Sequence, residues 1–313
     1  MISFFVTLLV LGIVIFVHEW GHFIIARLCK LPILRFSIGF GPAIFEYKDR
    51  KKTLWTVSGL PLGGYVHIAE KKMFGFTKII VSLAGPMMNF LLAFVLFTGT
   101  IYHIGRPTLS STIVQVLPNS LAALNDIRPN DKVLKINHLP FEQIHTLLKK
   151  NDTIHLHIQR NIEILEKDIV LKEPKLGIVF GIHSKSVSFL EAIQNAYYMV
   201  LDLSIKIIRG IFSVIGIKNM GGLGTLFSIS KSEYQAGWPS FFIFVGAFSI
   251  NLGILNLLPF PPLDGGHTLM GLYEMMTQRR LNKKLYLRIL FAGAFTIFGF
   301  FIISLINDLG WRF

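Results

Sequence analysis

The chain has 313 residues, of which 52% are hydrophobic and only 16% are charged, and it contains 28 phenylalanines. This composition excludes an ordinary soluble domain and is typical of a polytopic membrane protein. The formal net charge is +13. Because membrane proteins collect Lys and Arg in their cytoplasmic loops, this charge predicts topology, and we expect no nucleic-acid partner.

Four segments have the length and polarity of membrane spans, at residues 2–25, 79–104, 238–260 and 285–306. The loop between the first two spans is rich in Lys and Arg, and so is the connection between the last two. Basic loops of this kind stay in the cytoplasm. Both chain ends and the region between the second and third spans are then extracytoplasmic.

The first span ends in the motif Phe16-Val-His-Glu-Trp-Gly-His-Phe23. On a helix, His18 and His22 lie on one face, where both imidazoles can bind one tetrahedral metal ion. Glu19 lies about 100° round the helix axis and is free to act as a base. Paired histidines are often merely polar surface or satisfied core. Facing lipid, however, three such groups have no other physical justification, so we predict a zinc hydrolase site inside the bilayer.

The basic loop after the first span contains the segment Leu54–Ile68, in which two strand-like runs are joined through Pro61, Gly63 and Gly64. Two strand-like runs joined by a Pro/Gly cluster are typical of a β-hairpin. Its free edge could pair with an unwound peptide by strand addition, with Gly63 and Gly64 near that peptide. A hairpin that serves only packing is the alternative.

The region 108–184 is polar enough for an extracytoplasmic domain. Alternation in Thr153–Gln159 and in Ile162–Leu171 predicts paired strands, and Phe141–Lys150 predicts a short helix. The stretch Val114–Asn137 resembles a PDZ domain of the bacterial, protease-associated kind. Such domains usually have glycine near Asp126 and at the position of Asn130; asparagine also tolerates the left-handed conformation, so the turn is expected to form. A small α+β domain without a peptide groove is the alternative.

Residues 187–217 form an apolar pattern that Asp202, Lys206 and Arg209 interrupt at helical spacing. This pattern favours an amphipathic helix on the membrane surface over a fifth span. The expected domain organisation has an N-terminal membrane part, a PDZ-like domain, an amphipathic linker region and a C-terminal membrane part, at residues 1–107, 108–184, 185–237 and 238–313.

Two histidines do not complete a catalytic zinc site, which normally has three protein ligands. The third ligand is expected in Asn256-Leu-Leu-Pro-Phe-Pro-Pro-Leu-Asp-Gly-Gly-His267, at the end of the third span. Its prolines break the helix, which is tolerated at membrane depth only where the chain is buried or lines a cavity. Asp264 follows the break, and two glycines after it allow close approach of the backbone. Asp264 is the favoured ligand, and His267 is the competing one.

Two asparagines of the third span, Asn251 and Asn256, could hold the backbone of an extended substrate through their amides. Buried asparagine in a membrane helix otherwise joins neighbouring helices.

Together the first-span motif, Ala84-Gly-Pro-Met-Met-Asn-Phe90 in the second span and the Asn256–Gly265 pattern resemble the site-2 protease family of intramembrane zinc metalloproteases. With the PDZ-like domain, the chain is similar to the bacterial regulators of sigma-factor signalling. The resemblance implies a Zn²⁺ cofactor bound by His18, His22 and Asp264, with Glu19 as catalytic base.

The resemblance further implies a polytopic α-helical protein of the bacterial inner membrane. It has about four transmembrane helices, a membrane-associated β-hairpin and one extracytoplasmic PDZ-like α+β domain. Single-pass membrane proteins, such as anti-sigma factors or leftover signal peptides, would be cut within the bilayer. The PDZ-like domain would bind a new peptide C-terminus or act as a size filter. The chain departs from its relatives at Gly221–Thr225, where they usually have a Gly-Pro pair, and some relatives carry two PDZ units.

Two other functions are compatible with parts of the pattern. A membrane-anchored PDZ adaptor with a non-catalytic metal site would need no glutamate between the histidines, and Glu19 is present. A cation transporter would need further ionisable groups along the spans, and the second span has only His103 near its end.

Overall fold

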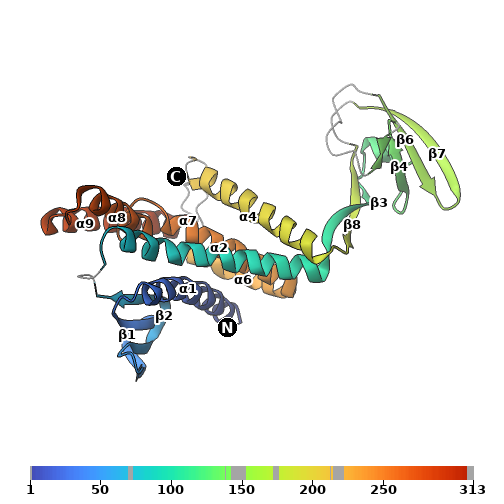
Figure 1. Ribbon diagram of the computed structural model, residues 1–313. Helices are drawn as coiled ribbons and strands as arrows, with labels where there is room; N and C mark the ends of the chain where they lie inside the picture. Colours follow the sequence, from blue (N-terminus) through green and yellow to red (C-terminus); the bar gives the residue numbers. More distant parts are fainter. Residues whose placement is uncertain are drawn as a thin grey trace. The chain divides into compact units, whose positions relative to one another are not determined.

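The computed structural model describes residues 2–69, 73–137, 139–141, 153–171, 176–211, 213 and 222–308. The chain divides into two compact units (Figure 1). Unit 1 comprises residues 1–103 and 188–313, and unit 2 comprises residues 104–187. The predicted extracytoplasmic domain, 108–184, falls within unit 2.

Unit 1 contains, in its described part, four helices long and apolar enough to cross a membrane. They are α1 (Ile2–Leu28), α2 (Phe76–Ile104), α7 (Trp238–Asn256) and α9 (Lys283–Asp308). They coincide with the four predicted segments, except that α7 ends at Asn256, before the predicted end at residue 260. Because proline has no N–H to donate and blocks the preceding turn, the helix stops ahead of the proline-rich stretch that begins at Pro259.

In its described part, unit 1 also contains the helices α4 (Phe189–Ile211), α6 (Leu223–Gln235) and α8 (Asp264–Thr277). On α4, Lys206 and Asp202 form an exposed ion pair of 2.7 Å, in keeping with the predicted amphipathic helix. No pattern in the sequence predicted α8, because its first turn contains two glycines, which are poor helix formers. The sequence also left the path near Gly221–Thr225 open; Gly222 is the N-cap of α6 there, and residue 221 lies outside the described part.

The loop between α1 and α2 forms a sheet of two long bent strands, β1 (Ile33–Lys48) and β2 (Leu54–Ile68), which pair antiparallel. The prediction of a hairpin within 54–68 is wrong, because the runs 54–57 and 64–68 pair with β1 and not with each other, and the turn that joins β1 to β2 lies at residues 49–53. The chain does reverse direction between these runs, since 54–57 pair in parallel register with residues 35–38 of β1 and 64–68 pair antiparallel with the same residues. The two runs of β2 therefore flank β1.

The sheet contacts α1 at two places along the helix. In the turn, the Asp49 carboxylate accepts hydrogen bonds from Thr53 N (2.8 Å) and from Arg27 Nη2 (2.9 Å), and Arg27 lies in the last turn of α1. Nearer the middle of α1, Phe36, which is 1% exposed, packs edge-on against Trp20. The run 64–68 is thereby placed beside the first-span motif.

Unit 2 is built on a six-stranded sheet of order β7-β6-β4-β3-β8, with β5 paired to β4. The elements are β3 (Arg106–Val116), α3 (Leu121–Leu124), β4 (Lys132–Ile136), β5 (Leu139–Pro140), β6 (Thr153–Arg160), β7 (Glu163–Val170) and β8 (Ile178–Lys185). The predicted paired strands are confirmed: β6 and β7 pair antiparallel, and the alternating residues Ile154, Leu156 and Ile158 are buried in the core. The predicted helix Phe141–Lys150 lies, after Phe141, outside the described residues.

The turn before β4 has the predicted left-handed asparagine, Asn130, with φ 73°, and Asp126 is left-handed as well, with φ 52°. Arg160 of β6 clamps this turn through bonds of 2.8 Å from Nε and Nη2 to the two carboxylate oxygens of Asp131. Burial raises the pKa of Asp131, but the hydrogen bonds from Arg160 and from the Arg128 backbone hold it below its ordinary value.

Helix α8 is joined to the start of α2 by a buried ion pair. The Glu274 carboxylate, 3% exposed as a residue, accepts hydrogen bonds from Lys78 Nζ (2.5 Å) and Gly75 N (3.1 Å). The positive N-terminal end of the α2 helix dipole also stabilises a carboxylate at this position. Gly271 allows this contact, since a Cβ on it would lie 2.8 Å from Ile79 Cγ1. We call the Glu274–Lys78–Gly75 contact the α8–α2 latch.

Substituting Glu274→Gln should lower the free energy of unfolding by about 3 kcal/mol, because it leaves the Lys78 ammonium buried without a counter-charge. Denaturant titration of the full-length protein in detergent measures this loss. The matched control is Asp202→Asn, which breaks the exposed pair on α4 and should cost less than about 0.5 kcal/mol. Equal losses in the two variants would contradict the role of the latch.

Candidate metal centre

Three of the predicted side chains converge on one point. His18 Nε2 lies 3.2 Å from His22 Nε2, and Asp264 Oδ2 lies 3.0 Å from the first nitrogen and 3.3 Å from the second. The histidines come from α1, one turn apart, and Asp264 is the first residue of α8. Among the described residues this is the one cluster of three His, Cys, Asp or Glu side chains with metal-ligand spacing.

The spacing fits a tetrahedral zinc ion. Zinc bonds to nitrogen and oxygen of about 2.0–2.1 Å put neighbouring ligand atoms about 3.3 Å apart. The tautomer of His22 leads to the same conclusion: its Nδ1 lies 2.7 Å from Val81 O and must donate to this carbonyl. If His22 is neutral, its Nε2 directs a lone pair at the Asp264 oxygen, an arrangement that a bound cation would stabilise.

His18 has a buried partner on α2. Its Nδ1 lies 3.1 Å from the side-chain amide nitrogen, Nδ2, of Asn89. Asn89 is fully buried, and its Oδ1 has no hydrogen-bond partner in the described structure. With the amide turned over, Oδ1 accepts the Nδ1 proton, and the lone pair of His18 Nε2 also points at the metal position. Asn89 is in turn held by Ser249 Oγ, which donates to its backbone oxygen at 2.9 Å.

Two glycines let α1 and α2 come into contact at this level. A Cβ on Gly85 would lie 2.3 Å from His22 Nε2 and 2.8 Å from His18 Cε1. On α1, a Cβ on Gly21 would lie 2.4 Å from Ala84 O. Both imidazoles therefore pack directly against the backbone of α2 at Gly85.

The segment that delivers Asp264 also depends on glycine. A Cβ on Gly265 would lie 2.2 Å from Leu257 O, and one on Gly266 would lie 2.3 Å from Pro261 N. The predicted close approach of the backbone after Asp264 is confirmed. The glycines let the first turn of α8 pack directly on the proline-rich stretch after α7.

Glu19 borders a cavity of about 340 Å³ that the three clustered side chains also line. The opposite wall is the run 65–68 of β2, and the Val66 backbone N–H faces the Glu19 carboxylate. Gly64 brings this strand close, since a Cβ on it would lie 3.1 Å from Glu19 Cγ. Glu19 thus shares the cavity with the metal position without belonging to the ligand cluster.

The other predicted residues are placed as follows. Asn256 lines the cavity, with its Nδ2 donating to Leu252 O at 3.1 Å. Asn251, earlier on α7, is not among the described residues that line it. Gly63 and Gly64 lie against α1 next to Glu19. His267 lines the cavity but does not belong to the three-residue cluster.

The sequence did not predict the roles of Val81, Gly85 and Asn89. The signal that could have found Gly85 and Asn89 is the Ala84–Phe90 segment, in which a Gly-Pro pair and an asparagine interrupt an otherwise apolar span, whereas apolar Val81 acts through its backbone and has no such signal. Small and polar residues inside a membrane helix mark the face that contacts other helices.

Helices able to span a membrane, with a His-His-Asp cluster and a glutamate in one cavity between them, define a metal-dependent hydrolase of the membrane. The profile of Peptidase family M50 matches residues 6–300 of the chain. The chain therefore belongs to this family, the site-2 proteases. It is a multi-pass membrane protein and a zinc metalloprotease.

Curated relatives agree over the whole length. The chain is 32% identical to "Putative zinc metalloprotease Cj1068" of Campylobacter jejuni, with 98% of this chain and 93% of the relative covered. It is 28% identical to "Metalloprotease MmpA" of Caulobacter vibrioides, with coverages of 96% and 94%. It is 25% identical to "Probable protease eep" of Enterococcus faecalis, with 97% of both chains covered.

Substituting Gly85→Ala should reduce the zinc content of the purified protein about tenfold or more, because the new methyl group takes the place of the His22 imidazole. Elemental analysis measures the metal, and cleavage of a transmembrane substrate measures activity. The control is Gly99→Ala on the same helix, where a Cβ would meet nothing within 4 Å. Zinc retained in full by Gly85→Ala would show that the imidazoles do not rest on α2.

Substituting Asn89→Leu should weaken zinc binding by about 10–100-fold, because His18 loses the group that orients its ring. Competition with a chelator gives the affinity. Thr98→Val is the matched control, since Thr98 lies buried on α2 and its hydroxyl has no partner in the described structure. A similar affinity in both variants would remove Asn89 from the site.

Proposed function

We propose that the protein hydrolyses peptide bonds within transmembrane segments of single-pass membrane proteins, with His18, His22 and Asp264 as zinc ligands and Glu19 as catalytic base. The observation that carries this proposal is the single cavity shared by the three converging ligand atoms and Glu19. A structural zinc site would be closed by a fourth protein ligand, whereas three ligands leave a position open for water.

Each residue has a defined task in the reaction. Zinc, when bound, supplies the Lewis acidity that makes water a nucleophile at neutral pH and polarises the scissile carbonyl. Glu19 takes the proton of the attacking water and delivers it to the leaving nitrogen. Val81 and Asn89 keep the ring nitrogens of His22 and His18 directed at the metal.

The substrate must unwind, because a helix hides its amides in internal hydrogen bonds. The run 64–68 of β2 lines the cavity, and in the described structure it pairs on one side only, with β1. We expect the substrate to add to its other edge as a strand next to Gly63 and Gly64. Asn256 lies across the same cavity and is placed to bind the extended backbone, while a role for Asn251 rests on the sequence alone.

The sheet carries exposed apolar side chains near its bent end, among them Phe40, Ile44, Phe45 and Leu60. Such a patch supports its association with the membrane. Basic loops support a bacterial inner membrane location with the metal centre toward the cytoplasmic side. Unit 2, with its left-handed turn residues, supports a PDZ-like domain that binds a trimmed peptide end or limits substrate size. Anti-sigma factors and leftover signal peptides are the expected substrate classes.

A membrane-anchored adaptor with a non-catalytic metal site remains the competing function. It gives no reason for a carboxylate in the cavity beside the metal position. Glu19 therefore discriminates between the two functions.

Substituting Glu19→Gln should abolish cleavage of a single-pass model substrate, by about 10³-fold or more, and leave the zinc content unchanged, because only the proton acceptor is lost. Gel analysis of the substrate and elemental analysis of the enzyme measure the two effects. In cells, the variant should accumulate truncated single-span proteins. Undiminished cleavage would rule out the protease mechanism, and a wild-type protein without zinc would favour the adaptor.

A further inference from the structure

The turn between β1 and β2 is tied to the end of the first span. Arg27, in the last turn of α1, donates from Nη2 to the Asp49 carboxylate at 2.9 Å and to Thr53 Oγ1 at 2.8 Å. Because α1 is a membrane span that ends at Leu28, its last turn lies at the level of the lipid headgroups. The β1–β2 turn is therefore held at that level too.

Hydrogen bonds to Asp49 fix the shape of this turn. Its carboxylate also accepts from Thr53 N at 2.8 Å and from Trp55 Nε1 at 3.3 Å, and its backbone oxygen accepts from Lys52 N at 2.9 Å. Lys52 is left-handed, with φ 66°, so the chain reverses tightly here. The backbone from which the neighbouring side chains project is thus fixed relative to α1.

Positive charge is in excess in this turn. Four of the residues 48–52 are cationic, and all four are exposed: Lys48, Arg50, Lys51 and Lys52. The carboxylate between them, that of Asp49, is already paired with Arg27. Within the part of the chain that the structure describes, no carboxylate pairs with the side chain of any of the four. We call these four residues the basic turn.

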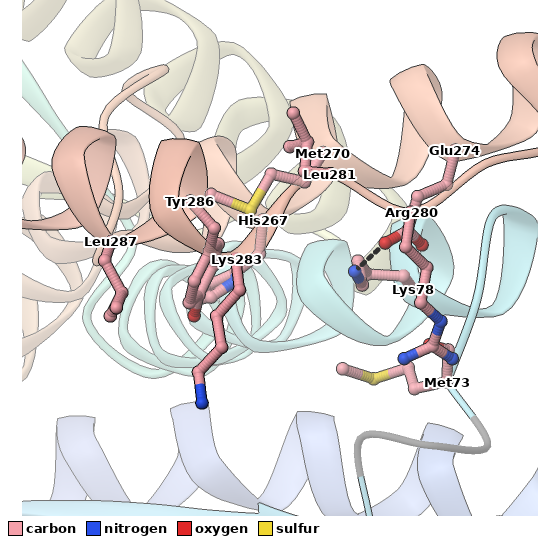
Figure 2. A pocket seen from close by; sticks show the side chains of 10 residues that line it. All are labelled: Met73, Lys78, His267, Met270, Glu274, Arg280, Leu281, Lys283, Tyr286 and Leu287. Atoms are coloured by element: carbon pink, nitrogen blue, oxygen red, sulfur yellow. Dashed lines mark hydrogen bonds and ion pairs between the residues drawn. The ribbon is translucent and has the colours of Figure 1, made fainter.

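Other cations of unit 1 are matched by carboxylates of the chain itself. Lys78 lines a cavity of about 320 Å³ next to the catalytic one, and Figure 2 shows its ion pair with Glu274. On β1, Arg35 pairs with Glu46 at 3.4 Å. The charge of the basic turn, in contrast, is available to an external anion.

An open cavity of about 460 Å³ lies beside the basic turn. Its lining consists of Arg50 and Lys51 of that turn, the Arg27–Asp49 pair, Phe23 and Tyr47. Tyr47 is 58% exposed, and its ring with a polar tip suits the boundary between headgroups and acyl chains. The lining therefore offers cations to a phosphate group and aromatic surface to the carbons next to it.

We propose that the basic turn and this cavity bind the headgroup of an anionic phospholipid, with Arg50 and Lys51 as ligands of its phosphate. Because the turn belongs to the same sheet as the run 64–68, a bound lipid would hold that sheet at a fixed depth in the membrane. Binding of the lipid does not depend on peptide hydrolysis, so this site can be tested apart from the protease function.

The test is native mass spectrometry of the full-length protein in detergent with equal amounts of phosphatidylglycerol and phosphatidylcholine. The wild type should retain phosphatidylglycerol about tenfold better, and the double variant Arg50→Gln, Lys51→Gln should retain it at most about threefold better. The control, Lys132→Gln with Lys135→Gln, removes the same charge from exposed positions on β4 of unit 2 and should behave as the wild type.

Equal preference in the two double variants would overturn the proposal, and so would a wild type that does not distinguish the lipids. The variant Arg50→Lys, Lys51→Arg keeps the charge and should keep the preference; its loss there would show that charge does not select the lipid. Inorganic phosphate should leave the lipid bound, because it lacks acyl chains. Displacement of the lipid by phosphate would assign the cavity to the free ion and overturn the lipid assignment.

Discussion

The structure depends on bringing three electron-pair donors together in an apolar surrounding. His18, His22 and Asp264 approach one another to 3.0–3.3 Å, a spacing that a bound zinc ion would match. The surrounding helices hold this arrangement in place. Val81 and Asn89 of α2 fix the rings, while the α8–α2 latch fixes the helix that carries Asp264. Thus α2 contacts both imidazoles and also the helix that begins with Asp264.

Close packing replaces the hydrophobic effect as the force between these helices, because lipid is as apolar as their side chains. Gly21, Gly85, Gly265 and Gly271 each lie where a Cβ would be less than 3 Å from a neighbouring atom. At these positions backbones meet directly, and polar atoms are brought within hydrogen-bonding distance. The glycines therefore allow the helices to approach closely, and the hydrogen bonds between the helices make that approach specific.

Local patterns in the sequence predicted the local parts of the molecule. The relation between His18, Glu19 and His22 follows from helix geometry, and the alternating residues of β6 and β7 follow from strand geometry. Asp264 was found because prolines mark a broken helix at membrane depth. Zinc and the protease family followed from these motifs.

Prediction from the sequence was wrong or incomplete where the structure depends on contacts between residues distant in the chain. A hairpin was predicted within 54–68 because Pro61 and Gly64 resemble a turn, whereas the runs on either side of them pair with residues 35–38 of β1 and not with each other. Helix α8 was missed because its glycines, unfavourable for a helix, are required by packing against Leu257 and Pro261. The contact of Gly85 with the imidazoles could not be read from either segment alone.

The order of the elements along the chain has a consequence for biosynthesis. His18 and His22 enter the membrane first, while Asp264 follows only after unit 2 and α7 have been made. On the proposed ligand assignment, a nascent chain has two of the three zinc ligands and gains the third only when α8 has been made. The proposed metal site is therefore complete only near the end of the synthesis of the chain.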